Sequence, residues 1–250
     1  MAQALKSFSA EGIVLNHYPT GRGNLFVHYY TAGSGKISAL MRKTGKACSA
    51  FAGCGELLSL ERIRVVPHKD YYILTGAEKI SRIGFTDLSF FYSANLFAEI
   101  IGRDLPEPDQ LIFSNFKNFL FETSQDDSLP RTLWFFALLL QELGWFPDFS
   151  SCAECRHELS EIAFFSLQSG GPVCESCARD TALLQAFQAS STELHSVFPQ
   201  TLDLCSRVQK TDFYRDLFCL LLKHCLFQRS DNLNTAGTLF RHFGIQPDTA

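Results

Sequence analysis

Four cysteines of the chain form two pairs with the same internal spacing. Cys152 and Cys155 lie in "SSCAECRHEL", and Cys174 and Cys177 lie in "GGPVCESCAR", so the whole pattern is C-x2-C-x18-C-x2-C. Each C-x2-C segment can form a tight turn whose two sulfurs converge on one ion, and two such turns supply the four ligands of a tetrahedral site. The spacing therefore predicts a zinc ion held by four thiolates.

A site of this composition is structural. Four thiolate ligands leave no open coordination position for a water molecule, so the ion cannot activate a nucleophile. Its contribution is to folding, on the order of 10 kcal/mol in small zinc peptides. The ion would stabilise the hairpin predicted for "AFFSLQSGGPV", with Gly170 and Gly171 at its turn.

Other interpretations of these thiols remain open at this point. The four cysteines could be ordinary buried residues, and His157, two positions after Cys155, could replace one ligand. A thioredoxin-like redox pair is disfavoured because neither C-x2-C follows a strand in a βαβ context. The remaining cysteines are interpreted as small apolar or loop residues; they are Cys48, Cys54, Cys205, Cys219 and Cys225.

The sequence matches none of the catalytic motifs considered below. "TAGSGKIS" resembles a phosphate-binding loop, but Tyr30 stands where that motif needs Gly and Ile37 where it needs Ser or Thr. H-E-x-x-H, G-x-S-x-G and the kinase motifs are absent, and the seven histidines are scattered without informative spacing. We therefore predict no catalytic residues and a protein that is not an enzyme.

The charge is unevenly distributed along the chain. The net charge is -4 overall, but residues 1–80 hold ten lysines and arginines and only five acidic residues, a net charge of +5, which leaves -9 for the remainder. Because charges are screened beyond roughly 8 to 10 Å at physiological salt, a polyanion responds to the face it meets and not to the net charge. Any nucleic-acid surface is therefore expected in the first 80 residues.

Cationic and aromatic residues are interleaved along this region. Arg42, Lys43 and Lys46 cluster in "MRKTGKAC", and Arg62 and Arg64 fall on one face of a predicted strand. A cationic groove with aromatic stacking platforms is typical of single-strand binders with a five-stranded barrel. The alternative is a solvated basic face with the aromatic residues in the core. The aromatic candidates are Phe26, Tyr29, Tyr30, Tyr71 and Tyr72, of which Tyr29 or Tyr71 is taken to stack on bases.

Strands are predicted first along the chain. Five β-rich segments cover residues 11–18, 24–31, 35–42, 55–66 and 71–80, separated by turns that contain Gly or Pro. Five strands in this length suit a small closed or nearly closed barrel, which leaves no exposed sheet edge.

Helices are predicted after residue 85. Helical periodicity covers residues 86–102, 108–124 and 128–144, and further helices are predicted at 175–189, 192–208 and 211–229. The predicted domains are 1–80, a nucleic-acid-binding barrel; 81–150, the first part of a helical domain; 151–180, the zinc module; and 181–250, the second helical part.

The sequence predicts a cytoplasmic localisation. Charged residues interrupt the longest apolar segments, "LWFFALLLQELGWF" and "FYRDLFCLLLKHCLF", before they reach the roughly 18 residues of a membrane span. The first thirty residues show no secretory signal, and nine cysteines fit a reducing compartment. We expect no membrane partner.

The order of these parts resembles the RecO family, the bacterial recombination mediator and DNA repair proteins. The resemblance is carried by "EGIVLNHYPTGRGNLFVHYYTAGSGKISALMRKTGK", "FYSANLFAEIIGRDLPEPDQLIFSNFKNFL", "LWFFALLLQELGWFPDFSSCAEC" and "AFFSLQSGGPVCESC". Two features depart from the family pattern. "TGRGN" stands where an acidic residue is usual, and "DNLNTAGTLF" is less regular than the helix expected near the end.

The resemblance implies an α+β multidomain protein, with an N-terminal OB-fold β-barrel followed by an α-helical domain that carries an inserted four-cysteine zinc-binding hairpin. Members of the family bind single- and double-stranded DNA, anneal complementary strands, contact RecR and single-stranded DNA-binding protein, and help RecA load. In the nucleoid of a bacterial cytoplasm, this chain would do the same. The residues expected to contact phosphates are Arg22, Lys36, Arg42, Lys43, Lys46, Arg62 and Arg64.

Two other functions remain as alternatives. A zinc-ribbon interaction adaptor that never touches DNA predicts association insensitive to salt and no annealing. A zinc deaminase needs a His-x-Glu motif beside its cysteines, and the absence of that motif disfavours it. The aromatic content of residues 90–146 further suggests a protein-binding surface in the helical part.

Overall fold

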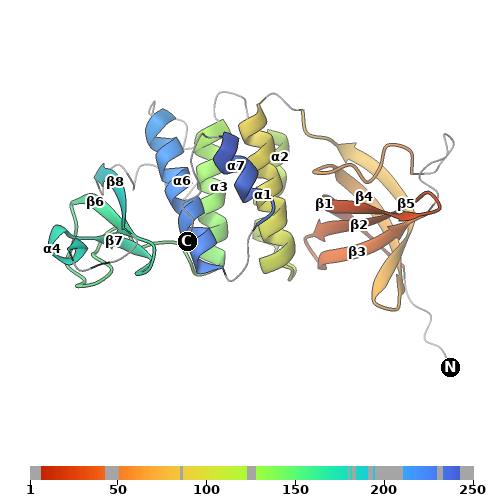
Figure 1. Cartoon of the computed structure of the whole chain (residues 1–250). Coiled ribbons are helices and arrows are strands. Elements are labelled where there is room, and N and C mark those ends of the chain that lie inside the picture. The colour runs from red at the N-terminus through yellow and green to blue at the C-terminus, as the bar shows by residue number, and fades with distance from the viewer. Residues whose placement is uncertain are drawn as a thin grey trace. The chain divides into compact units, whose positions relative to one another are not determined.

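The computed structural model describes residues 7–42, 51–84, 87–122, 128–179, 181, 184–190, 194, 211–229 and 233–242. The chain divides into two compact units, Met1–Thr123 and Ser124–Ala250. Among the described residues, the first unit holds five strands and two helices, and the second holds a three-stranded sheet and further helices (Figure 1). The predicted domain boundaries at 80, 150 and 180 remain proposals.

Five strands close into a barrel in the order β1-β2-β3-β5-β4. In the sequence, apolar and polar residues alternate along these segments; the strand β3, for example, buries every second residue, as a closed barrel requires. Neighbouring strands pair antiparallel except β3 and β5, which run parallel. The strands are β1 (Phe8–Gly21), β2 (Asn24–Thr31), β3 (Gly35–Met41), β4 (Leu60–His68) and β5 (Tyr71–Ser81). The predicted five-stranded barrel is confirmed.

A buried carboxylate links the barrel core to the loop before β4. Glu61 is fully buried and accepts hydrogen bonds from the Tyr29 hydroxyl at 2.8 Å, the Gly55 N–H at 2.6 Å and the Ser59 hydroxyl at 2.9 Å. Removing one partner of such a group leaves a buried polar atom unpaired, which costs about 1 to 3 kcal/mol. Glu61 therefore fixes the loop before β4 against the barrel core.

The two helices of the first unit are amphipathic. The first, α1 (Leu88–Asp104), begins at the cap Asp87, whose carboxylate accepts from the N–H groups of Ser89 and Phe90. The second, α2 (Gln110–Glu122), follows after a short loop. The rings of Phe97 and Phe119 lie 5.3 Å apart edge to face, so apolar stripes of both helices pack on each other. The helices predicted at 86–102 and 108–124 are confirmed.

The loop between α1 and α2 packs on the β2–β3 hairpin. The Lys36 N–H donates to Pro106 O at 2.7 Å, and the Tyr30 hydroxyl donates to Glu107 O at 3.0 Å. Gly35 has φ +60, and a Cβ added there would lie 2.2 Å from Pro106 O. Only glycine therefore permits this approach of the two backbones.

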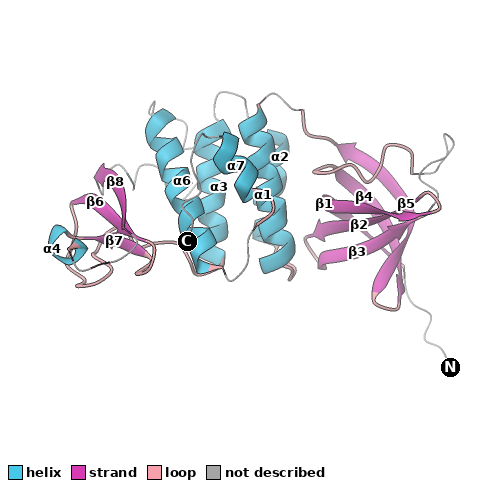
Figure 2. Ribbon diagram, viewed as in Figure 1, coloured by secondary structure: helices cyan, strands magenta, loops and turns pink. Residues whose placement is uncertain are grey.

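The second unit combines helices with a small sheet (Figure 2). The helices α3 (Ser128–Glu142) and α6 (Thr211–Gln228) lie side by side, with the rings of Phe136 and Phe218 5.4 Å apart. Strand order in the sheet is β7-β6-β8. Phe187 of β8 stacks on Phe213 of α6, so the sheet packs on this helix. The remaining elements are β6 (Glu161–Ser166), β7 (Gly171–Val173), α4 (Glu175–Ala178), β8 (Leu184–Ser190) and α7 (Ala236–His242).

One helix prediction in the second unit is wrong. The described residues of the range 175–189 form the short helix α4 and, from Leu184 on, the strand β8, because Leu184 to Ser190 pair antiparallel with β6. The prediction at 211–229 is confirmed by α6, and α7 was not predicted. The helix predicted at 192–208 lies outside the described residues apart from position 194.

Candidate metal centre and nucleic-acid interface

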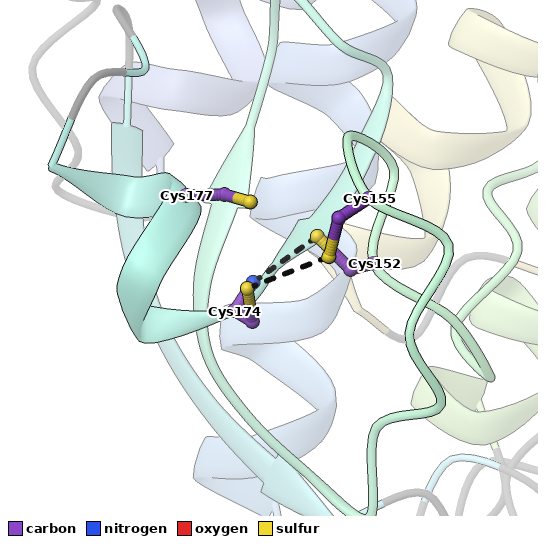
Figure 3. Close-up of side chains that lie close together, drawn as sticks. All are labelled: Cys152, Cys155, Cys174 and Cys177. Atoms are coloured by element: carbon purple, nitrogen blue, oxygen red, sulfur yellow. Dashed lines mark hydrogen bonds between the residues drawn. The ribbon is translucent and has the colours of Figure 1, made fainter.

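The four paired cysteines come together in space. Their sulfur atoms all lie within 4.8 Å of one another, and the Sγ atoms of Cys155 and Cys174 are 3.8 Å apart. A tetrahedral site with metal–sulfur bonds of about 2.3 Å places its sulfurs about 3.8 Å from each other. Figure 3 shows the four sulfurs directed toward a common centre from a loop and from the start of α4. The cluster could therefore hold a metal ion.

Two local turns place the sulfurs. In the first, the Arg156 N–H donates to Cys152 O at 2.9 Å, and the Cys152 N–H donates to His157 O at 2.8 Å. Arg156 itself adopts φ 62, the left-handed conformation that reverses the chain after Cys155. These bonds fold the first C-x2-C segment into a compact turn.

The second pair begins where β7 ends. Cys174 is the N-cap residue of α4, and the Ala178 N–H donates to its carbonyl at 2.9 Å, which brings Cys177 into the first helical turn. The hairpin between the pairs turns at Gly170, which has φ 73, followed by Gly171 at the start of β7. The predicted hairpin and its turn are confirmed.

The thiols of the cluster differ in the direction of their pKa shifts. The Ser176 hydroxyl, 3.0 Å from the Cys174 sulfur, and the Cys177 N–H lower the pKa of Cys174 to about 6. Burial raises the pKa of Cys152, but backbone N–H groups of neighbouring residues outweigh it and the net shift is downward. The pKa of Cys177 is raised to about 12, mainly by side-chain hydrogen bonds to the sulfurs of Cys174 and Cys155. Thiolate character in such a cluster favours metal binding.

The other candidate ligand lies outside the cluster. His157 is exposed and does not belong to the group of converging atoms. Within the described ranges, these four cysteines form the one group of three or more metal-ligating side chains that converge. Four sulfurs complete a tetrahedral shell, so the arrangement suits a structural ion.

Four of the predicted phosphate-binding cations are exposed on the barrel, and three of these have no carboxylate partner among the described residues. Arg22 lies in the turn between β1 and β2 with φ 54, Arg42 follows β3, and Arg64 lies on the outer face of β4. In the part of the chain that the structure describes, none of the three is in an ion pair. Lys43 and Lys46 lie outside the described residues.

Two other predicted cations are engaged within the protein. Arg62 lies 3.6 Å from a Glu11 carboxylate oxygen and 3.5 Å from one of Glu78, so local carboxylates offset its charge. The Lys36 ammonium donates to Gly102 O at 2.6 Å, in the last turn of α1. A cation stabilises a helix at this end because the terminal carbonyls lack partners and carry partial negative charge.

An aromatic cluster covers part of the barrel's outer surface. We call Tyr18, Phe26, His28, His68 and Tyr71 the ring cluster. Ring centroids are 5.4 Å apart for Tyr18 and Phe26, 5.7 Å for Phe26 and Tyr71, and 4.9 Å for His68 and Tyr71. Tyr18 is 45% exposed. Burial and the nearby Lys36 lower the pKa of His28, which favours its neutral form.

The two turns beside the ring cluster carry cations. Arg22 lies in the turn between Tyr18 and Phe26, and Lys69, exposed and with φ 52, lies in the turn between His68 and Tyr71. Sequence reasoning missed Tyr18, His28, His68 and Lys69 as candidates. The available signal was the pairing of Tyr18 with Phe26 across a tight turn, which places both rings on one face.

Tyr29 was a predicted stacking residue, and that prediction is wrong. Tyr29 and Tyr30 are both 0% exposed, and the Tyr29 ring lies in the barrel core. Burial and the neighbouring Glu61 raise the pKa of Tyr29. Tyr71 belongs to the ring cluster, whereas Tyr72 is partly buried and packs edge to face on Phe8 at 5.6 Å.

The helical and cysteine-bearing part of the chain is similar to a known family. The family "Recombination protein O C terminal" matches residues 86–228, more than half of the chain, including all four clustered cysteines. The chain belongs to the RecO family. The resemblance stated from the sequence is thereby confirmed.

Several RecO relatives are similar over most of their length. "DNA repair protein RecO" of Acidithiobacillus ferrooxidans is 30% identical over 179 residues, covering 68% of this chain and 69% of the relative. The protein of the same name from Thermodesulfovibrio yellowstonii is 28% identical, with 68% and 70% covered. That of Acetivibrio thermocellus is 24% identical, with 74% and 77% covered.

Among the described residues of this RecO family member, no helix has the length and apolar character needed to cross a bilayer.

Proposed function

We propose that the protein is a recombination mediator in DNA repair. In this proposal it binds single- and double-stranded DNA, anneals complementary strands and, with RecR, helps RecA load onto DNA coated with single-stranded DNA-binding protein. Membership of the RecO family and relatives named DNA repair protein RecO support this role. The site of action would be the nucleoid in a bacterial cytoplasm.

The ring cluster beside two cationic turns is the observation that carries the proposal. In OB-folds, the β2–β3 face and the loops joining β1 to β2 and β4 to β5 bind oligonucleotides. Here those loops carry Arg22 and Lys69, and the rings of Tyr18, Phe26 and Tyr71 lie between them. Cations offset phosphate repulsion, and exposed rings accept unstacked bases of any sequence.

Phosphate contacts are proposed for the exposed cations first. Arg22, Arg42 and Arg64 are the strongest candidates because each is exposed without an ion pair in the described ranges. Lys43 and Lys46 remain candidates from the sequence alone. Arg62 and Lys36 are weaker candidates, because both charges already have partners within the protein.

We propose Zn2+ as the ion of the four-cysteine cluster, with a structural role. Cys152, Cys155, Cys174 and Cys177 would be its ligands, and tetrahedral thiolate coordination is characteristic of this metal. The ion would hold the β6–β7 hairpin to the loop before it. The protein would act without catalytic turnover, because annealing needs only reduced repulsion between strands while the bases recognise each other.

The test measures annealing and single-strand affinity over a salt series. Labelled complementary oligonucleotides report annealing, and fluorescence anisotropy with oligothymidine reports affinity. The Tyr18→Ala/Phe26→Ala double variant should bind oligothymidine at least about tenfold more weakly, since each stacked base contributes about 1 to 3 kcal/mol. Arg22→Ala should reduce the slope of log K against log salt by about 0.7.

Arg241→Ala is the matched control, because Arg241 is an exposed arginine on α7 in the second unit. This variant should keep the affinity and the salt slope of the parent protein. If association did not change with salt concentration and no annealing was seen, the proposal would be contradicted and the interaction adaptor favoured. If Tyr18→Ala/Phe26→Ala, Arg22→Ala and Arg241→Ala all lost DNA affinity equally, the barrel face would be excluded as the binding site.

A further inference from the structure

A groove lies beside the metal cluster in the second unit. Its volume is about 710 Å³, within the range of about 300 to 1,000 Å³ typical of ligand pockets. It is lined by residues 158–160 before β6, by residues of β6, β7 and β8, by Cys174 of the cluster and by the first residue of α4. None of the barrel residues discussed above lines this groove, so a ligand bound here would not compete directly for those residues.

The floor of the groove is apolar. Leu159 and Ala163 are half-buried and expose apolar surface there, and the buried side chains of Ile162, Val173 and Ala189 also contribute to the lining. Such a floor favours contact with methylene groups or with an aliphatic side chain, because this contact removes apolar surface from water.

The rim of the groove is acidic. Glu158, Glu161 and Glu175 line it, and all three are exposed. Within the described residues, none of these carboxylates is in an ion pair. Their charge adds to the net -9 of residues 81–250. A phosphate backbone would meet like charge here, so the rim disfavours nucleic acid.

An apolar floor below carboxylates matches one kind of side chain. Lysine and arginine have an apolar stem that packs on apolar surface and a charged head that stays at the polar edge. We propose that this groove binds a basic segment of a partner protein, with lysine or arginine stems on the floor and their heads paired with Glu158, Glu161 and Glu175. Charge complementarity would both steer the partner and exclude DNA.

The experiment uses the full-length, metal-loaded protein and a fluorescein-labelled heptapeptide of alternating lysine and leucine. Anisotropy should show saturable binding that weakens as salt is added. The same peptide with glutamate in place of lysine should not bind. Glu161→Gln/Glu175→Gln should lower the affinity for the lysine peptide about fivefold or more, since each exposed pair contributes up to about 1 kcal/mol.

The matched control is Glu122→Gln/Glu142→Gln, which neutralises two exposed glutamates that do not line the groove. It should bind the lysine peptide like the parent, and both variants should keep the parent's metal content. Equal affinity in the two variants would overturn the proposal, as would absence of saturable binding or tighter binding of an oligonucleotide to this groove. Self-association that blocks the peptide and is lost in Glu161→Gln/Glu175→Gln would identify a second copy as the occupant and also overturn it.

Discussion

At the scale of single residues, His224 connects three parts of the second unit. Its Nε2 lies 2.8 Å from Trp145 O, and its ring lies edge to face on Phe165 of β6 at 5.5 Å. Gly170, at the turn of the β6–β7 hairpin, is close enough that an added Cβ would lie 3.5 Å from the His224 ring. The side chain is 2% exposed. His224 therefore ties the hairpin and the sheet to α6.

The first prediction concerns the pH dependence of stability. Burial lowers the pKa of His224 below its usual 6.5, although the bond to Trp145 O acts in the opposite direction. The unfolded chain therefore binds a proton first as the pH falls, so stability is fully present above pH 6.5 and is lost below it. The slope is at most about 1.4 kcal/mol per pH unit. Urea unfolding at several pH values should show a flatter profile for His224→Gln than for the parent.

His17→Gln is the control for this prediction, because His17 is exposed on β1. It should keep the parent's pH profile. If His224→Gln and the parent lose stability in parallel as the pH falls, another group is responsible for the titration.

Residue-scale predictions from the sequence succeeded where spacing alone determines geometry. Cys152, Cys155, Cys174 and Cys177 were identified because two C-x2-C turns can meet at one centre in only a few ways. Tyr29 was misassigned because aromatic residues stand on both faces of β2. Tyr29 and Val27 point into the core and Phe26 belongs to the ring cluster, and a shift of one residue exchanges these faces.

At the scale of elements, Lys36 belongs to the junction between β3 and the end of α1. Its ammonium donates to Gly102 O, and its own N–H donates to Pro106 O. Arg64, by contrast, lies on the outer face of β4 and is exposed. The two cations should therefore contribute to different properties.

The second prediction separates these two roles by a matched pair of variants. Lys36→Met should lower the free energy of unfolding by about 1 kcal/mol, because a terminal carbonyl of α1 loses its charged donor. It should leave the salt slope of DNA binding unchanged. Arg64→Met should keep the stability and reduce the slope by about 0.7. Chemical denaturation and anisotropy measure the two quantities, and the reverse pattern would refute the assignment.

Predictions of whole elements failed where strand pairing outweighed the helix propensity of the residues. "LQAFQAS" is rich in Ala and Gln, which favour helix over strand, yet these residues form β8 because β6 offers a partner strand. Phe187 and Ala189 are buried and Ala186 and Gln188 exposed, a period of two that follows from this pairing. The strand could not be identified without knowing that β6 was adjacent.

At the scale of the whole molecule, the excess of positive charge and the four-cysteine cluster lie in different parts of the chain. The excess of cations falls in residues 1–80, within the first compact unit, and the four cysteines fall in the second. Two compact units each with a core can unfold separately, so a single two-state transition is not expected. The metal should stabilise only the unit that binds it.

The third prediction follows from this separation. Calorimetry should show two transitions, and removal of the metal by a chelator or by Cys174→Ser should lower one of them and leave the other in place. Cys219→Ala is the control, because Cys219 is a buried thiol of the second unit whose pKa is raised to about 12 mainly by burial, and it lies outside the cluster. It should keep the parent's metal content. A downward shift of both transitions on chelation would contradict the separation.

The close approach at Gly35 limits how the barrel can be exchanged or engineered. The β2–β3 hairpin supplies the donors for Gly102 O, Pro106 O and Glu107 O, all beyond the last strand of the barrel. A chimera that grafts a foreign barrel ahead of residue 82 would leave these three acceptors without donors, and any side chain at position 35 would collide with Pro106. Transplantation should therefore succeed only when the segment through residue 108 moves together with the barrel.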